Sequence, residues 1–242
     1  MTPTLLAFDT ATEQLSIALA RRGELFEHEA AGGAQASATL IPAILALLAR
    51  GGVALADLDA IAFGRGPGAF TGLRTACSVA QGLAFGAAKP VLPIDSLLAV
   101  AEDARGDDAR AQCVWVAMDA RMNEVYAAQY AFADGCWATL DAPLLTTPEQ
   151  LNARWRVQPP DLVAGNALAA FGAQLVTGTA RCAPAALPRA RAMLPLAYAM
   201  WSAGGGLDAA LALPLYVRDK VAQTTLERDA ARAAKALPER SR

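Results

Sequence analysis

The chain has 242 residues and a formal net charge of −2 at pH 7, and hydrophobic residues make up 55% of it. This apolar content is well above that of disordered chains and can fill one large domain or two ordinary ones. The near-neutral balance excludes a general attraction to nucleic acid or anionic lipid. The charge is nevertheless uneven: residues 218–242 hold seven Lys/Arg and four Asp/Glu, a net of +3, which leaves −5 for the rest. A body of that sign is not expected to bind a nucleic-acid backbone alone.

The metal-ligating and redox-active residues are few and scattered. No CxxC pair occurs, so zinc knuckles and thioredoxin-like chemistry have no support, and reduced, buried thiols in a cytosolic protein are expected. The cysteines are Cys77, Cys113, Cys136 and Cys182. The sole histidine, His28, cannot supply a His-x-x-x-His pair and is expected to be a strand residue. No secretory leader is expected either, because Asp9 and Glu13 fall where its apolar region would lie.

The first elements in chain order are strands. Apolar runs at residues 5–8, 15–20 and 25–28 alternate with turn signals, the second of which is the hairpin pair Arg22-Gly23. A helix over 37–50 follows, with Ser37 or Thr39 as its cap, Pro42 in its first turn and Gly51-Gly52 at its end. Its apolar positions are too many for one face, which predicts cover on two sides. These positions are Leu40, Ile41, Ile44, Leu45, Leu47 and Leu48.

The next segment repeats the strand-to-helix pattern. Residues 60–63 form a predicted strand that enters a glycine-rich loop, and a helix over 71–85 ends near Gly86. A strand over 91–94 precedes a helix that Ser96 is expected to cap. The polar run 105–108 marks a boundary. Further on, 161–164 is a predicted strand before a Gly165-Asn166 turn, and 189–203 a predicted helix kinked at Pro195.

The opening pattern occurs twice. The segment Leu6-Ala7-Phe8-Asp9 is repeated at an offset of 110 by Val116-Ala117-Met118-Asp119. At the same offset, Val125 corresponds to Leu15 and Ala128 to Ala18. The turn signal Asp134-Gly135 occupies the place that Arg22-Gly23 has in the first half. Such a repeat predicts an α/β protein with two lobes of duplicated ribonuclease-H-like fold, the actin-like ATPase arrangement. The expected division is a first lobe over 1–106, a second lobe over 107–217 and a charged segment over 218–242.

The loop Gly64–Arg74 has two interpretations. It is neither a Walker A loop nor a Rossmann fingerprint, because no Gly-Lys-Ser/Thr follows and Ala69 stands at the third glycine position. Exposed N–H groups at the helix start can bind an anion, with Arg65 or Arg74 adding charge. Alternatively, the glycines allow a tight strand-to-helix connection. The candidate phosphate-facing residues are Asp9, Thr10, Arg65, Gly66, Gly68, Thr71 and Arg74.

Asp9 and the helix after the loop each have two interpretations as well. Asp9 ends a strand at the place where actin-fold ATPases direct an acidic residue towards Mg²⁺, and Thr10 and Thr12 could contact phosphate there. The favoured interpretation is an Asx-turn in which the carboxylate accepts from local N–H groups, and Asp119 can be explained in the same way. Small residues recur at every fourth position of the helix, namely Gly72, Ala76, Ala80 and Ala84. This stripe permits close approach of a helix from another protein or close packing on the chain's own sheet.

The motifs together resemble the TsaB (YeaZ) family of tRNA threonylcarbamoyladenosine biosynthesis proteins, which are glycoprotease-like. The most specific matches are Gly-Arg-Gly-Pro-Gly-Ala-Phe-Thr-Gly-Leu-Arg at 64–74 and Asp-Ala-Arg-Met-Asn-Glu-Val-Tyr at 119–126. Weaker matches lie at 6–12, 80–84 and 214–218, so the resemblance runs to about Val221. One departure is Ala36, where many relatives have a histidine.

The resemblance implies a cytoplasmic, non-catalytic subunit without a cofactor or metal. Its partners would be a TsaD-like transferase and a TsaE-like ATPase; it would form a homodimer in isolation, meet tRNA only through the complex, and have no membrane contact. In the family, pairing uses the helices here at 37–50 and 71–85. We predict that the loop Gly64–Arg74 supports the partner-binding helix more than it holds nucleotide. The expected interface residues are Leu40, Ile44, Leu47, Leu48, Gly72, Leu73, Ala76, Ala80, Leu83 and Ala84. The alternatives are a glycoprotease-like metallopeptidase, which the missing histidines disfavour, and an actin-fold small-molecule kinase.

Overall fold

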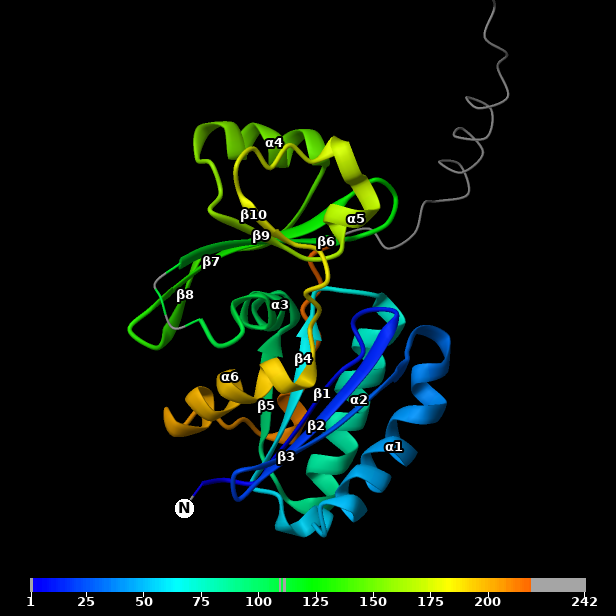
Figure 1. Cartoon of the computed structure of the whole chain (residues 1–242). Helices are drawn as coiled ribbons and strands as arrows, with labels where there is room; N and C mark the ends of the chain where they lie inside the picture. The colour runs from blue at the N-terminus through cyan, green and yellow to red at the C-terminus, as the bar shows by residue number, and fades with distance from the viewer. Residues whose placement is uncertain (1, 109, 111, 219–242) are drawn as a thin grey trace, which may run out of the picture.

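A computed structural model describes residues 2–108, 110 and 112–218, and it contains two five-stranded sheets (Figure 1). The first sheet has the order β3-β2-β1-β4-β5 and the second the order β10-β9-β6-β7-β8. The strands of the first are β1 (Leu5–Asp9), β2 (Gln14–Arg21), β3 (Glu24–Ala31), β4 (Ala60–Gly66) and β5 (Val91–Asp95). Those of the second are β6 (Gln112–Asp119), β7 (Val125–Ala133), β8 (Cys136–Thr146), β9 (Leu162–Ala164) and β10 (Arg181–Ala183).

The two sheets have the same topology, which confirms the predicted duplication. In each, the first three strands are antiparallel neighbours, and the last two run parallel to the first. The expected correspondence holds for the first strand and for the hairpin between the second and third strands, but not for the positions within the second strand. Asp9 faces Ser16, whereas Asp119 faces Val125, so Ser16 rather than Leu15 is the equivalent of Val125. The turn after β6 is one residue shorter than the turn after β1, so the offset is 109 rather than 110 in the second strand. Arg22-Gly23 and Asp134-Gly135 both form the hairpin between the second and third strands, as predicted.

The helices cover both sheets in layers (Figure 1). α1 (Ala36–Arg50) and α2 (Phe70–Ala87) pack on one face of the first sheet, and α3 (Ser96–Arg105) lies between the two sheets. Alternate residues of β6 divide the second core: Val114 and Val116 face α3, while Trp115 and Ala117 face α4 (Pro148–Val157) and α5 (Ala167–Phe171). Short 3₁₀ turns lie at η1 (Gly33–Gln35), η2 (Leu55–Asp57), η3 (Gly172–Gln174) and η4 (Ala209–Leu211).

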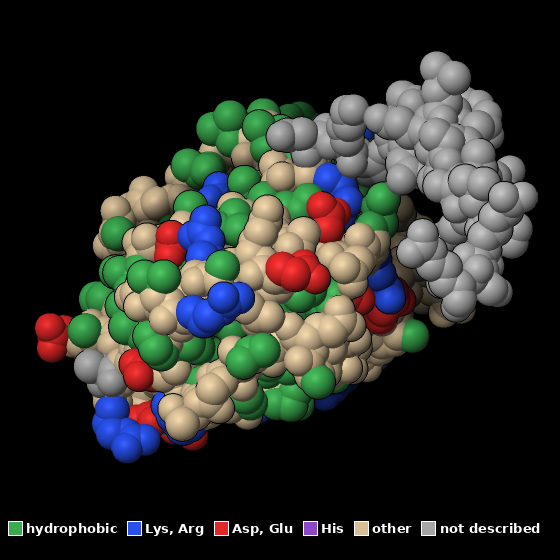
Figure 2. Space-filling view, turned by 90° about the horizontal axis from the view of Figure 1, so that it is seen from above, with side chains coloured by type: hydrophobic (Ala, Val, Ile, Leu, Met, Phe, Trp, Pro, Cys, Tyr) green, Lys and Arg blue, Asp and Glu red, His purple; other side chains and the backbone are tan. Residues whose placement is uncertain are grey.

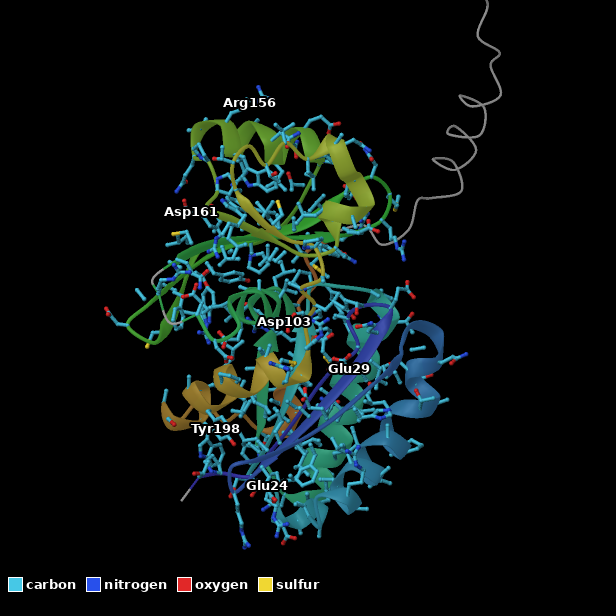
Figure 3. The ribbon with its side chains drawn as sticks, viewed as in Figure 1. Glu24, Glu29, Asp103, Arg156, Asp161 and Tyr198 are labelled. Atoms are coloured by element: carbon cyan, nitrogen blue, oxygen red, sulfur yellow. The ribbon has the colours of Figure 1, made fainter. Side chains whose placement is uncertain are left out.

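The remaining helix, α6 (Ala190–Ser202), returns to the first lobe although its sequence lies within the range expected for the second. Its Met193, Leu194 and Ala197 share a core with Leu5 and Ala7 of β1. Arg189, just before the helix, forms ion pairs with Glu29 of β3 and Asp103 of α3, two residues that Figure 3 labels on their elements. Apolar side chains on the second face of the first sheet need cover, and α6 supplies it.

Two helix starts differ from the sequence prediction. α1 begins at Ala36, after a 3₁₀ turn and without a side-chain cap, so Pro42 lies in its second turn rather than its first. The Thr39 hydroxyl instead donates to the carbonyl of Gln35. Ser96 does not cap α3, because it is the first helical residue and its hydroxyl bonds elsewhere. The predicted kink residue Pro195 does lie inside α6.

The described part of the chain contains no helix that is both long and apolar enough to cross a lipid bilayer. The uncharged stretch 162–180 forms a strand, a turn, a short helix and a 3₁₀ turn, as the sequence predicts. Of the charged segment expected over 218–242, only Arg218 belongs to the described residues.

Candidate functional site

A cleft of about 240 Å³ lies between the lobes. The turn after β1 and the turn after β6 line it, together with the glycine-rich loop, the start of α3 and the segment around Tyr216. These are the places where the sequence puts its acidic and glycine-rich motifs, so the fold brings together residues from both halves of the chain. Of the seven candidate phosphate-facing residues, however, only Gly68 is among the residues that line this cleft.

Asp9 is buried, and two groups donate hydrogen bonds to its carboxylate. Its Oδ1 accepts from the Ala11 amide at 2.6 Å and its Oδ2 accepts from the Ser96 hydroxyl at 2.6 Å. The Ser96 oxygen in turn accepts from the Gly66 amide at 3.2 Å. A side chain at Gly64 would overlap the carboxylate, so the loop packs directly against it. These contacts support the Asx-turn interpretation, and burial raises the pKa of Asp9 from 3.8 to about 6.

Thr10 joins the first turn to α2. Its buried hydroxyl donates to the carbonyl of Gly72 at 2.8 Å, and a Cβ at Gly72 would overlap the carbonyl oxygen of Thr10. Gly68 has the same role one turn earlier, since a Cβ there would lie 2.6 Å from the Ala11 carbonyl oxygen. The Ala69 amide donates to that oxygen at 2.8 Å. The glycines thus permit a close approach of two backbones, which supports the tight-connection interpretation of the loop.

The loop arginines contact groups of the chain itself. Arg65 Nε lies 2.5 Å from Asp95 Oδ1. Arg74 lies over the ring of Phe70, 3.9 Å from its centroid, and its Nε donates to the Tyr216 hydroxyl at 3.1 Å. The phosphate-facing role of these residues and of Thr71 stays a prediction. Their observed contacts stabilise the loop and the start of α2.

The second turn is built from the motif at 119–126. Asp119 Oδ1 accepts from the Arg121 amide at 2.8 Å, and the Asp119 amide donates to Asn166 Oδ1 at 2.8 Å. The side chain of Arg121 reaches across the cleft to Glu13 at 2.8 Å. Residues 121–123 all have positive φ, a left-handed run that Asn123 accepts readily and the two others do not. Asp119 is therefore a turn residue, as the sequence favours.

The helix residues expected to bind a partner mostly pack inward. Nine of the ten are buried within the chain itself, and the tenth, Leu83, packs against the same core. The nine are Leu40, Ile44, Leu47, Leu48, Gly72, Leu73, Ala76, Ala80 and Ala84. The stripe of small residues therefore serves the protein's own core, because α2 must approach β4 and the turn at Thr10 closely.

The outward faces of the same two helices expose other apolar side chains. Ile41 is 42% exposed and Leu45 52% exposed on α1, and Phe85 is 85% exposed on α2. The prediction that the wide stripe of α1 cannot all face one sheet is thus confirmed.

Figure 2 views the molecule from above, and acidic and basic side chains are interspersed on the face seen in that view.

The described residues contain no group of three His, Cys, Asp or Glu side chains placed to hold a metal ion. Cys77 is buried, and burial raises the pKa of its thiol to about 11. Cys136 and Cys182 are exposed, so the expectation of buried thiols is wrong for these two residues. His28 is a half-buried residue of β3 opposite Ile17, as predicted for a strand residue. Sequence reasoning missed Ser96 and Arg218 as residues that organise the cleft.

Comparison with known proteins agrees with this architecture. Residues 28–173 match the family model described as "TsaD: tRNA N6-adenosine threonylcarbamoyltransferase". The tRNA threonylcarbamoyladenosine biosynthesis protein TsaB of Haemophilus influenzae is 37% identical over 226 residues, covering 90% of this chain and 94% of that protein. Its namesake in Escherichia coli is 33% identical over 232 residues, covering 90% and 96%. YeaZ from Pseudomonas aeruginosa superposes with a TM-score of 0.80 at 37% identity, covering 88% of this chain and 99% of that one.

The duplicated topology and the YeaZ superposition define a two-lobed α/β protein of the actin-like, ribonuclease-H-like class. The family model bears the name of the transferase, but the relatives that match over nine-tenths of their length bear the name TsaB. The chain belongs to the TsaB (YeaZ) family, a glycoprotease-like family.

Proposed function

We propose that this chain takes part in tRNA threonylcarbamoyladenosine biosynthesis as a non-catalytic subunit. In this proposal it binds a TsaD-like transferase, helps to recruit a TsaE-like ATPase, and contacts tRNA only within that complex. It forms a homodimer when the transferase is absent, and it works in the cytoplasm. The names of the full-length relatives support the pathway.

One observation carries the subunit role: the unpartnered apolar side chains Ile41, Leu45 and Phe85 on the outward faces of α1 and α2. Large apolar side chains that gather on adjacent helices are typical of protein interfaces. Both helices pack against the same core on one face of the first sheet, so their outward faces lie on the same side of the first lobe. The contacts of the candidate phosphate-facing residues add support, because Asp9, Arg65 and Arg74 all bond to groups of the chain itself.

The catalytic part of the proposal is tested on tRNA. Unmodified tRNA is incubated with ATP, threonine, bicarbonate and an enzyme that forms the threonylcarbamoyl adenylate, and its nucleosides are analysed by mass spectrometry. We expect modified adenosine only when a TsaD-like subunit and a TsaE-like ATPase join this chain. Modified adenosine from this chain without the other two would refute the subunit role.

The partner surface is tested by charge insertion at exposed positions. Leu45→Asp and Phe85→Asp should abolish capture of the TsaD-like subunit and dissociate the homodimer, because a buried unpaired charge opposes association. Val157→Asp is the matched control, since Val157 is 88% exposed at the end of α4 in the other lobe. Capture that survives both substitutions would place the interface elsewhere.

A further inference from the structure

The segment that follows η4 crosses the mouth of the cleft and contacts both lobes. We propose that residues 214–218, called the strap below, act as an intramolecular latch that holds the two lobes closed over the cleft. This inference is independent of the proposed function.

The first half of the strap is attached to the first lobe. The Leu215 amide donates to the carbonyl of Arg65 at 2.7 Å, and the Leu215 carbonyl lies so close to Gly66 that a Cβ there would be 3.0 Å from its oxygen. The ring of Tyr216 stacks on Phe70 with centroids 5.3 Å apart. Arg74 covers the other ring of this pair and bonds to the Tyr216 hydroxyl. The glycine-rich loop is thus the docking site of the strap.

The second half is attached to the second lobe. Val217 packs against the core between α3 and the second sheet. The guanidinium of Arg218 donates to the Ala120 carbonyl at 2.9 Å and lies 2.6 Å from Glu124 Oε2. The side chain of Arg218 is only 15% exposed, so this ion pair is shielded more than the other contact across the mouth, Arg121 to Glu13, whose side chains are 70% and 79% exposed.

The strap and α3 connect the two lobes at different places around the cleft. α3 joins the lobes at the base of the cleft, where Leu97 and Val100 line it, whereas the strap joins them on the side where the two turns face each other. Only Val217 lies between Tyr216 and Arg218, so the strap cannot lengthen to keep both sets of contacts. Separation of the two turns would therefore break either the Tyr216 contacts or the Arg218 contacts. Sub-global opening of a protein is governed by such local contacts. The strap therefore sets the population of the open form.

The test measures access to the cleft wall by thiol labelling, with each modified cysteine identified by peptide mass spectrometry. Val100→Cys places a thiol on a fully buried cleft position, and native Cys77 in the first-lobe core reports unfolding of that lobe. In this background, Arg218→Ala removes the contacts of the strap with the second lobe, and Tyr216→Ala removes its side-chain contacts with the first lobe. Arg154→Ala is the matched control, because it removes an arginine from the pair with Asp141 within the second lobe, away from the cleft.

We expect each strap substitution to raise the labelling rate of the introduced cleft thiol by about tenfold or more while the rate at Cys77 stays unchanged, since the open form is a sub-global state. Arg154→Ala should change neither rate. Unchanged labelling of the introduced thiol in both strap variants would overturn the proposal. A parallel rise at Cys77 would overturn it too, because the strap would then be a part of the general fold rather than a latch. If one variant fails to fold, the other decides.

Discussion

The hydroxyl of Ser96 lies 2.6 Å from Oδ2 of Asp9, and this bond joins the start of α3 to the end of β1 across 87 positions of sequence. Both groups are buried, and the serine oxygen also accepts from the Gly66 amide of the glycine-rich loop. Three segments of the cleft wall therefore meet at one carboxylate. Its protonation should affect the stability of the whole first lobe.

Asp9→Asn should remove one component of the pH dependence of stability. Burial raises the pKa of Asp9 from 3.8 to about 6, so the folded protein binds this proton more tightly than the unfolded chain does. The Asp9 contribution to the free energy of unfolding is therefore most favourable below pH 4. It declines by roughly 3 kcal/mol as the pH rises to above 6, since each pKa unit corresponds to about 1.4 kcal/mol.

The measurement is urea unfolding of both proteins at several values between pH 4 and 8. Other carboxylates titrate in both proteins, so the difference between wild type and variant isolates Asp9. The variant should gain stability relative to wild type as the pH rises. A difference that stays constant with pH would contradict the assignment.

Gly72→Ala should destabilise the protein by about 3 kcal/mol, because overpacking against rigid backbone is costly. The added Cβ would overlap the carbonyl oxygen of Thr10. Gly82→Ala on the same helix is the control, since nothing lies within 4 Å of a Cβ there. It should stabilise by up to about 1 kcal/mol through helix propensity. Chemical denaturation distinguishes the two, and equal effects would show that the close approach at Thr10 is not structurally important.

Ala80→Arg should prevent stable folding, as should Ala76→Arg, because both side chains are fully buried beneath α2. Ser78→Arg places the same charge on the exposed side of this helix and should leave the melting temperature nearly unchanged. Circular-dichroism melts decide between the two outcomes. If Ala80→Arg melts like Ser78→Arg, the small-residue stripe is not part of the protein's own core.

Tyr130→Phe should raise stability by about 1 kcal/mol, because it removes a buried polar group that lacks a partner. The Tyr130 ring is fully buried, and its hydroxyl has no hydrogen-bond partner among the described residues. Tyr198→Phe is the contrasting change, because that hydroxyl donates to the Pro3 carbonyl at 3.3 Å. It should lower stability slightly. A loss of stability in Tyr130→Phe, measured by urea unfolding, would mean that the hydroxyl has a partner.

The sequence by itself determined the local elements and their duplication. Period-two and helical patterns located the strands and helices, because side-chain periodicity reflects the backbone geometry of each element. The repeat of Leu6–Asp9 at Val116–Asp119 predicted two lobes, and both sheets indeed have one topology. The wide apolar stripe of α1 indicated that its side chains cannot all face one sheet, and Leu45 is indeed 52% exposed.

Only the tertiary structure decided which surfaces these elements meet. A stripe of small residues fits a partner helix and the chain's own backbone equally well, and the close approach of Gly72 to Thr10 depends on a contact across 62 positions. For the same reason, chain order places α6 in the second lobe although it covers the first sheet, and the local pattern predicts a helix cap at Ser96 although its hydroxyl bonds to Asp9. Capping and periodicity are local signals, whereas the strap at Tyr216 and the Asp9 bond join residues far apart in sequence, whose proximity no local pattern encodes.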